Sequence, residues 1–200
     1  LIEAEKLKQQ LSLNLLQQQV NPHFLYNTLD NICALAELDE KETLIQLVMN
    51  LSSFYRSSLS NGKMHISIGQ ELEISRAYLE ILQIRYFHKF DFTITCPEAL
   101  KNYSCIKLLL QPILENSIYH GIKGLDRHGI LHIEAEDAGD CIRFTISDNG
   151  RGFSKEDYEK IWQQDADHFG IKSIQQRILL YYGPGYGLSM ESPQTGGCIT

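Results

Sequence analysis

The chain has 200 residues, enough for one ordinary domain or two small ones. It is 43% hydrophobic and 22% charged, so it can bury a core and does not have the composition of a disordered segment. Its 25 acidic and 18 basic residues give a net charge of −7, which argues against a broad basic surface for nucleic acid. We therefore expect no nucleic-acid partner.

The sequence contains no run of about 18 apolar residues that would form a membrane-spanning helix. Its five cysteines are widely spaced and form no CxxC pair, which favours free thiols in a reducing compartment over a disulfide scaffold or a zinc site. The chain opens without Met and stops in GGCIT. We expect it to be an excised piece of a longer protein.

The first 62 residues predict an antiparallel helical hairpin. Residues 1 to about 37 are rich in helix formers and carry apolar stripes at helical spacing, with an expected kink at Pro22. After LDEKE the apolar spacing resumes at Leu44 and ends at Asn61-Gly62, a helix stop. Two helices alone bury too little surface, so we expect the hairpin to pair with a second copy as a four-helix bundle.

From residue 63 to residue 200, strand and helix patterns mix, which predicts an α/β sandwich. We expect strands at 64–68, 90–96, 131–137, 141–147, near 186–191 and at 197–200, and helices at 70–88, 106–120 and 170–182. The segment 148–170 carries glycines and little apolar periodicity. The predicted fold class is therefore α+β with two domains, residues 1–62 and 63–200.

His23 is the first candidate functional residue. On a helical wheel it faces away from the main apolar stripe and shares its face with Asn27 and Asp30. A neutral imidazole presents a nitrogen lone pair that is a competent nucleophile near neutral pH. Taken alone, the pattern is more typical of a surface histidine beside a proline kink.

The segment LLLQPILENSIYHG predicts a helix whose apolar residues face the core, so that Glu115-Asn116 and His120-Gly121 point elsewhere. An asparagine oxygen can complete the shell of a magnesium ion that also binds phosphate oxygens. The adjacent carboxylate of Glu115 can orient a water or hold a polar group. The same residues also fit an ordinary polar helix face.

Two glycine motifs follow. In SDNGRGF, Gly150 and Gly152 let the backbone approach a flat ligand or phosphates, and Asp148 at a strand end can accept a hydrogen bond from an exocyclic amino group. In HFGIKSIQQRI, Gly170 at a helix start can place backbone N–H groups against phosphates. A lone DNG is usually a turn, and a single glycine motif is weak evidence.

The motifs NPHFLYN, LQPILENSIYHG, DNGRGF and FGIKSIQQRI, in this order, resemble a sensor histidine kinase of the LytS/YehU type over essentially all 200 residues. The stretch ELEISRAYLEILQIRYFHKF is similar to the helix that joins the two domains in that family. The resemblance implies a dimerisation and phosphoacceptor hairpin at 1–62. It also implies a Bergerat-type ATP-binding domain, of the gyrase, heat-shock-chaperone, histidine-kinase and MutL group, at 63–200 with a truncated last strand.

The same resemblance implies an activity and cofactors. A protein-histidine kinase of this type uses ATP and Mg²⁺ to phosphorylate its own histidine and passes the phosphoryl group to an aspartate of a response regulator. The implied partners are a response-regulator receiver domain and a second copy of the chain. The implied location is cytoplasmic, in a protein held in the bacterial inner membrane by segments outside this chain.

Individual residues match the motifs of the family. His23 matches the phosphorylated histidine, Asn116 the magnesium-binding asparagine and Asp148 the aspartate that reads the adenine amino group. Gly150 and Gly152 match the glycines beside that aspartate.

The remaining candidates flank these matches. Gly170 matches the second glycine box, where Ile171 and Lys172 follow it, and residues 153–168 would form the lid over the nucleotide. His120 joins Asn116 in the nucleotide site, Glu115 is a candidate catalytic carboxylate, and Asn27 is placed to orient the imidazole or a water.

Two features depart from the family pattern. The second glycine box usually reads GxGLxN and here reads HFGIKS, and Tyr119 stands where many relatives carry Lys. Phe24 follows the phosphoacceptor as in the LytS/YehU type, whereas other histidine-kinase families carry an acid there, so the general base is not obvious. Lys172 and Arg177 are candidates for replacement charge. These departures leave two further functions open: a nucleotide-binding regulatory dimer with little or no kinase activity, and an ATPase or protein-serine kinase of the same group.

Overall fold

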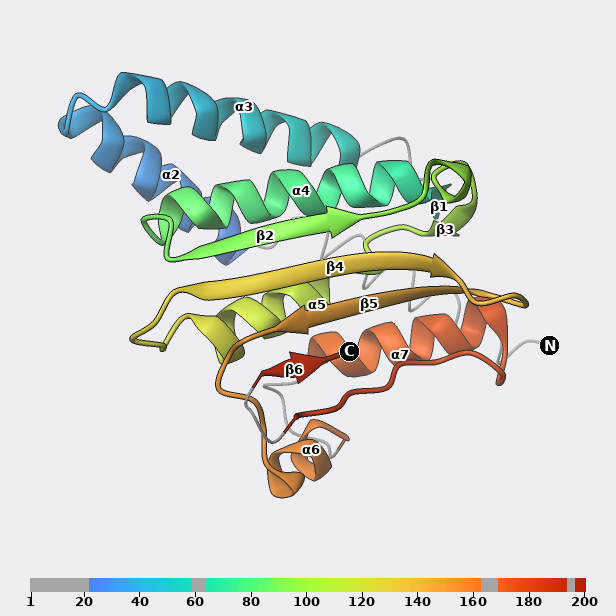
Figure 1. The fold of residues 1–200 in the computed structure, drawn as a ribbon. Coiled ribbons are helices and arrows are strands. Elements are labelled where there is room, and N and C mark those ends of the chain that lie inside the picture. The colour runs from blue at the N-terminus through green and yellow to red at the C-terminus, as the bar shows by residue number, and fades with distance from the viewer. Residues whose placement is uncertain (1–21, 59–63, 163–168, 194–196) are drawn as a thin grey trace.

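The computed structural model describes residues 22–58, 64–162, 169–193 and 197–200. Helices α2 (Pro22–Glu37) and α3 (Lys41–Ser58) form an antiparallel hairpin at one edge of the molecule (Figure 1). This part of the predicted hairpin is confirmed. The expected helix over residues 1–21, its kink and the stop at Asn61-Gly62 lie outside the described residues.

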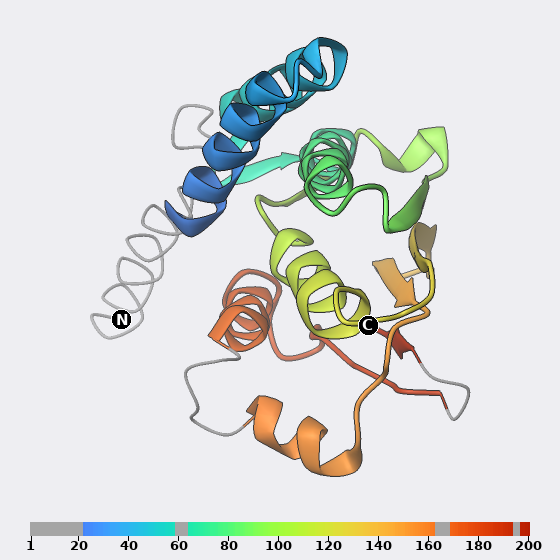
Figure 2. The same ribbon diagram turned by 90° about the vertical axis from the view of Figure 1, so that its left-hand side faces the viewer.

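The second part is an α/β sandwich. Its mixed sheet has the strand order β2-β4-β5-β6, in which only the β2–β4 pair is parallel, and β1 and β3 form a separate antiparallel pair. Figure 2 shows α4, α5 and α7 as one layer on one face of the sheet. The elements are β1 (His65–Ser67), α4 (Ile68–Arg85), β2 (Phe90–Thr95), the 3-10 turn η1 (Glu98–Leu100), β3 (Ser104–Ile106), α5 (Gln111–Asn116), the π-helix η2 (Ser117–Ile122), β4 (Gly129–Asp137), β5 (Ile142–Asp148), α6 (Lys155–Trp162), α7 (Phe169–Tyr182) and β6 (Cys198–Ile199).

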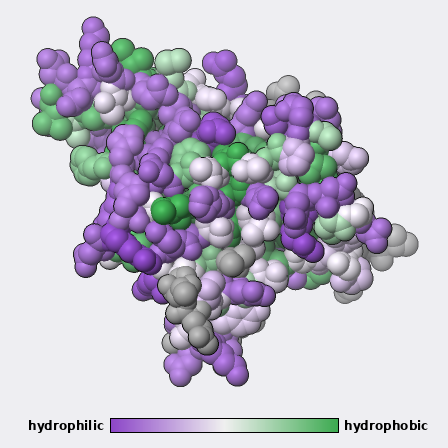
Figure 3. Space-filling view, in the orientation of Figure 1, coloured by the Kyte–Doolittle hydropathy of each residue, from purple (hydrophilic) through white to green (hydrophobic). Residues whose placement is uncertain are grey.

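The predicted hairpin of two strands is confirmed in β4 and β5. Leu131 and Ile133 of β4 are buried under the helices and alternate with the exposed residues His132 and Glu134. This alternation is typical of a sheet with one covered face. The turn is closed at Gly139, whose φ of +87° favours glycine. Figure 3, which views this side of the molecule, shows mostly hydrophilic atoms over the open face.

The predicted helix at 106–120 is wrong at its start. Residues Ser104–Ile106 instead form β3, and Leu108 has a φ of +54°, which no helix accommodates. The helix therefore begins at Gln111, with a proline in its first turn, and runs on as the π-helix η2 to Ile122.

Two further expectations differ. The segment near 186–191 was predicted to form a strand. The structure shows only a single-residue β-bridge there, at Glu191. In the segment 148–170, where apolar periodicity is weak, it shows the helix α6. The first turn of α6 is stabilised by a polar cap, in which the Ser154 hydroxyl accepts from the Asp157 N–H at 3.1 Å. The spacing of apolar residues cannot predict such a contact.

Two buried charges hold the segment between β3 and α5. The Glu71 carboxylate on α4 accepts from the backbone N–H groups of Leu108 (2.8 Å) and Leu110 (2.9 Å). The Arg177 guanidinium on α7 donates to the carbonyl oxygens of Leu108 (3.1 Å) and Lys107. Arg177 is 2% exposed, so it is part of the core and is not the replacement charge for phosphate that the sequence suggested.

The helical hairpin packs directly on the second part. The Phe24 ring lies 5.4 Å from the Phe54 ring of α3 and 5.1 Å from the Tyr78 ring of α4, measured between centroids. Phe24 is 2% exposed, so this aromatic cluster is a true core contact between the hairpin and α4. None of the helices described is long and apolar enough to cross a bilayer.

Candidate nucleotide cavity and phosphoacceptor histidine

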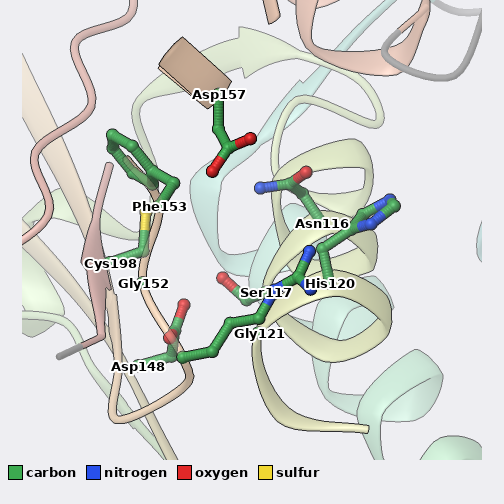
Figure 4. A pocket seen from close by; sticks show the side chains of 10 residues that line it. Asn116, Ser117, His120, Gly121, Asp148, Gly152, Phe153, Asp157 and Cys198 are labelled. Carbon is green, nitrogen blue, oxygen red and sulfur yellow. The ribbon is translucent and has the colours of Figure 1, made fainter. Parts of the chain in front are cut away.

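A cavity of about 90 Å³ opens between η2 and the end of β5, under the first turn of α6 (Figure 4). A wider hollow of about 520 Å³ adjoins it and shares four of its residues. The cavity is lined by Asn116, Ser117, His120, Gly121, Asp148, Arg151, Gly152, Phe153, Asp157 and Cys198.

Asp148 lies at the bottom of this cavity with one carboxylate oxygen unused. Its Oδ1 accepts from the Gly150 N–H at 2.9 Å, while its Oδ2 is buried and has no hydrogen-bond partner among the described residues. Burial raises the pKa of Asp148, and the Gly150 N–H, the Ser117 side chain and the Cys198 N–H partly offset that effect. A buried acceptor without a donor is costly, so this oxygen fits a ligand that brings an N–H group.

The DNG turn and η2 touch backbone to backbone. A Cβ on Gly150 would stand 2.7 Å from both the Gly121 Cα and the Asp148 Oδ1, so only glycine fits there. The Arg151 N–H donates to the Gly121 carbonyl at 3.2 Å, which closes the same contact. The two glycines therefore fix the place of the Asp148 carboxylate.

Side chains at the end of α5 and in η2 point to two different sides. Asn116 of α5 and His120 of η2 line the cavity, whereas Tyr119 of η2 faces α4, where its hydroxyl accepts from Arg85 Nη1 at 3.3 Å. Burial raises the pKa of Tyr119 to about 12. The Tyr119 side chain is thus used for packing between α4 and η2.

The second glycine box lies apart from the cavity. Gly170 is in the first turn of α7, where a Cβ would stand 3.3 Å from Pro112 Cβ, and Ile171 is buried in the core. Lys172 is half-buried. Among the residues described, none of these three lines the cavity.

Glu115 also lies outside the cavity lining, on the face of α5 toward α4. Its Oε1 accepts from Gln111 Nε2 at 3.1 Å. Burial, and secondarily the nearby Glu115 carboxylate, raises the pKa of Tyr78 well above its usual range. Glu115 is therefore placed between the aromatic cluster under the hairpin and the cavity residue Asn116.

His23 is exposed in the first turn of α2, and it is not among the cavity-lining residues described. The next residue, Phe24, points into the core toward α4. Asn27, one turn on, is half-buried, and its Nδ2 has no hydrogen-bond partner in the described part of the chain. The structure thus brings Asn116, His120, Asp148 and Gly152 together and leaves His23 outside.

Sequence reasoning missed Ser117, Arg151 and Cys198 as cavity residues, and it included Phe153 and Asp157 only as part of the expected lid, residues 153–168. Cys198 pairs with Asp148 in the register of β5 and β6, which a truncated strand at the end of a sequence does not reveal. All five cysteines are free thiols, as predicted.

Comparison with known sequences identifies this arrangement. Residues 11–90 match the family described as Histidine kinase, and residues 103–193 match the family described as Histidine kinase-, DNA gyrase B-, and HSP90-like ATPase. The chain belongs to the histidine kinase family. All residues that line the cavity of this histidine kinase except Cys198 lie within the second match, and His23 lies within the first.

Individual relatives agree with the family. The sensor histidine kinase YesM of Bacillus subtilis is 32% identical over 98% of this chain and 33% of its own length. The sensor protein LytS of Staphylococcus haemolyticus is 28% identical over 98% of this chain and 34% of its own length. The chain spans about a third of the length of these curated relatives.

A solved structure shares the fold. The histidine kinase ThkA, in a crystal structure with the response regulator TrrA, superposes with a TM-score of 0.52 and 15% identity, over 98% of this chain and 63% of that one. This likeness confirms the predicted fold class, a helical part followed by an α/β ATPase domain.

Proposed function

We propose that ATP binds in the cavity between Asn116 and Asp148, that its γ-phosphoryl group is transferred to His23, and that the phosphohistidine passes this group to an aspartate of a response-regulator receiver domain. The observation that carries this proposal is the buried, unpartnered Asp148 Oδ2 in the ATPase-like half of a chain whose other half exposes His23.

The residues present fit an adenine nucleotide. Asp148 Oδ2 can accept the hydrogen bond of the adenine amino group, and Gly121 and Gly152 let the ligand approach the backbone closely. Asn116 would hold Mg²⁺, which would neutralise charge on the phosphates. Within the described residues no cluster of three or more His, Cys, Asp or Glu could bind a metal by itself, which suits an ion that is held largely by phosphate oxygens.

The proposed chemical step needs little from the protein beyond positioning. A lone pair of the neutral His23 imidazole forms the N–P bond while the bond between the γ-phosphorus and the β–γ bridging oxygen breaks, and ADP leaves with that electron pair. Asn27, one turn from His23, would orient the imidazole or a water. Glu115, which accepts a hydrogen bond from Gln111 and lies beside Tyr78 of α4, would position Asn116.

The transfer requires a rearrangement. His23 does not line the cavity, and the Phe24–Phe54–Tyr78 cluster holds the hairpin against α4. An ATP-loaded cavity therefore reaches a His23 only after the second domain leaves this docked position, or when it meets the hairpin of a second copy. We place the boundary between the two domains at residues 62 and 63.

The hairpin carries an exposed apolar face that suits a second copy. Large apolar side chains stay exposed on both helices although the opposite sides are buried. An antiparallel pair of helices with such a face would complete its core as a symmetric four-helix bundle. In the whole protein, this dimer would work beneath membrane segments outside this chain. The exposed face is formed by Tyr26, Leu29, Cys33 and Ala36 of α2 and Ile45, Val48 and Met49 of α3.

The deciding experiment is incubation with γ-labelled ATP and Mg²⁺, followed by an acid-stability test of the label. We expect the wild-type chain to take up acid-labile label, the His23→Gln variant to take up none, and the matched His88→Gln variant, at an exposed turn, to label normally. Label that persists in His23→Gln would exclude His23 as the acceptor. Acid-stable label would indicate a serine kinase, and an unlabelled wild type would indicate a regulatory dimer.

A further inference from the structure

The cavity contains an oxygen donor that none of the family motifs in the sequence assigns. Asp157, in the first turn of α6, lines both the cavity and the adjoining hollow. Asn116 lines the same cavity from α5, and Figure 4 shows the Asp157 carboxylate and the Asn116 carboxamide turned toward the same part of the cavity, one from above and one from the side.

The Asp157 carboxylate is held in place by the root of α6. Its Oδ2 accepts from the Ser154 N–H at 3.1 Å and from the Ser154 hydroxyl at 2.8 Å. The neighbouring Phe153 N–H donates to the Ser192 hydroxyl at 3.0 Å, which ties this root to the chain beyond α7. A carboxylate has about four lone-pair sites, so its hydrogen bonds with Ser154 do not by themselves prevent it from binding a cation.

We propose that Asp157 is, together with Asn116, an oxygen ligand of the divalent cation that accompanies the nucleotide, and that α6 closes over the nucleotide only when this cation is present. The inference rests on the proposed function in that it requires ATP to bind in this cavity. Mg²⁺ in phosphate sites takes one or two protein oxygen ligands besides phosphate oxygens and waters, which is the set that Asn116 and Asp157 supply.

The same charge explains why closure would depend on the metal. Without a cation, the Asp157 carboxylate and the phosphates repel each other across a partly enclosed site, so α6 stays away from the nucleotide. Arg151 also lines both hollows, and its fixed charge attracts phosphate whether or not a metal is bound. Dependence on the metal therefore separates the contribution of Asp157 from that of Arg151.

The sequence provides a reporter on this helix. Its single tryptophan, Trp162, is the last residue of α6. The chain is saturated with a non-hydrolysable ATP analogue and titrated with MgCl₂. The fluorescence of Trp162 would then report the movement of α6. Binding of Mn²⁺ to the same nucleotide complex, measured from the electron paramagnetic resonance of free Mn²⁺, gives the metal affinity independently of fluorescence and of activity.

The test compares three variants. Asp157→Asn keeps an oxygen for the α6 cap and removes the charge, and we expect it to raise the half-saturating metal concentration by at least about tenfold in both measurements. Glu156→Gln makes the same charge change on the preceding residue, which does not line the cavity, and this control should stay within about twofold of the wild type. Ser154→Ala removes one hydrogen bond that holds the Asp157 carboxylate, so it should weaken metal binding, but less than Asp157→Asn does.

The possible results separate the two proposals. If Asp157→Asn binds the analogue and keeps the wild-type metal affinity, or if Glu156→Gln shifts that affinity equally, Asp157 is not a ligand and the inference is overturned while the proposed function stands. If the wild-type chain binds no ATP analogue at all, with or without metal, both proposals fail.

Discussion

Asp148 uses its two carboxylate oxygens for different tasks. Oδ1 fixes the DNG turn through the Gly150 N–H, and Oδ2 is left for the ligand. An asparagine at this position has one acceptor and one donor, so it cannot serve both the Gly150 N–H and an amino group of the base. In the proposed site, specificity for adenine would thus depend on the ionised carboxylate of one residue, which the neighbouring glycines hold in place.

We therefore predict that Asp148→Asn weakens ATP binding by about 10- to 150-fold, the equivalent of a lost hydrogen bond to a charged group, at roughly 1.5–3 kcal/mol. Calorimetric titration of ATP and of GTP measures the effect, and the ratio of the two affinities should approach one in the variant. Asp91→Asn, an exposed aspartate in β2, is the matched control and should leave both affinities unchanged. An unaltered preference for ATP in Asp148→Asn would contradict this role.

Some residues of the cavity could be predicted from the sequence, and others could not. Asn116, His120, Asp148 and Gly152 stand in contiguous motifs, and all four line the cavity. Cys198 enters only because β6 pairs with the end of β5, and no local pattern encodes a pairing between strands 50 positions apart.

At the scale of elements, patterning located most helices and strands because their apolar residues repeat at regular spacing. It failed where backbone conformation or polar contacts decide. The start of α5 is delayed by the left-handed Leu108, and the cap of α6 depends on Ser154 and Asp157 rather than on apolar residues. The widened turn of η2, which begins directly after Asn116, is likewise invisible in a helical wheel drawn at a constant angle.

Arg177 is the charge that joins three of these elements, and it gives a prediction of stability. Arg177 donates hydrogen bonds to the carbonyls of Lys107 and Leu108 and lies near the buried Glu71 carboxyl. Arg177→Met therefore removes the hydrogen-bond donor of both carbonyls and the positive charge near Glu71. We expect the free energy of unfolding in urea to fall by about 3–5 kcal/mol.

The matched control is Arg143→Met. Arg143 pairs with Glu136 at 2.9 Å, but its side chain is 62% exposed, and such pairs contribute at most about 1 kcal/mol. Equal losses of unfolding free energy in the two variants would show that the buried contacts of Arg177 stabilise the fold no more than a surface ion pair does.

At the scale of the whole molecule, the hairpin has two apolar sides, of which only one is covered by the rest of the chain described here. One side packs on α4 through Phe24 and Phe54, and the other is exposed. The fold and the two parts of the chain follow from sequence patterns, whereas the docking of the hairpin on α4 does not, because the same stripe could have faced a second copy.

The exposed side predicts where two copies meet. Cys33 lies in the middle of its α2 stripe, so in a symmetric bundle the two copies of Cys33 should lie close to each other across the twofold axis. We predict that a short bismaleimide converts the chain to a covalent dimer, that Cys33→Ser abolishes this product, and that Cys141→Ser, at a half-buried thiol near the β4–β5 turn, does not.

The matching non-covalent measurement is sedimentation equilibrium, where wild type and Cys33→Ser should both be dimers and Tyr26→Glu should shift toward monomer because it buries a charge in the interface. A dimer cross-linked equally well in Cys33→Ser would place the contact elsewhere, and a monomeric wild type would leave the exposed face of the hairpin without its proposed occupant. A dimeric result would also supply what the docked chain lacks, a second hairpin whose exposed His23 an ATP-loaded cavity can approach.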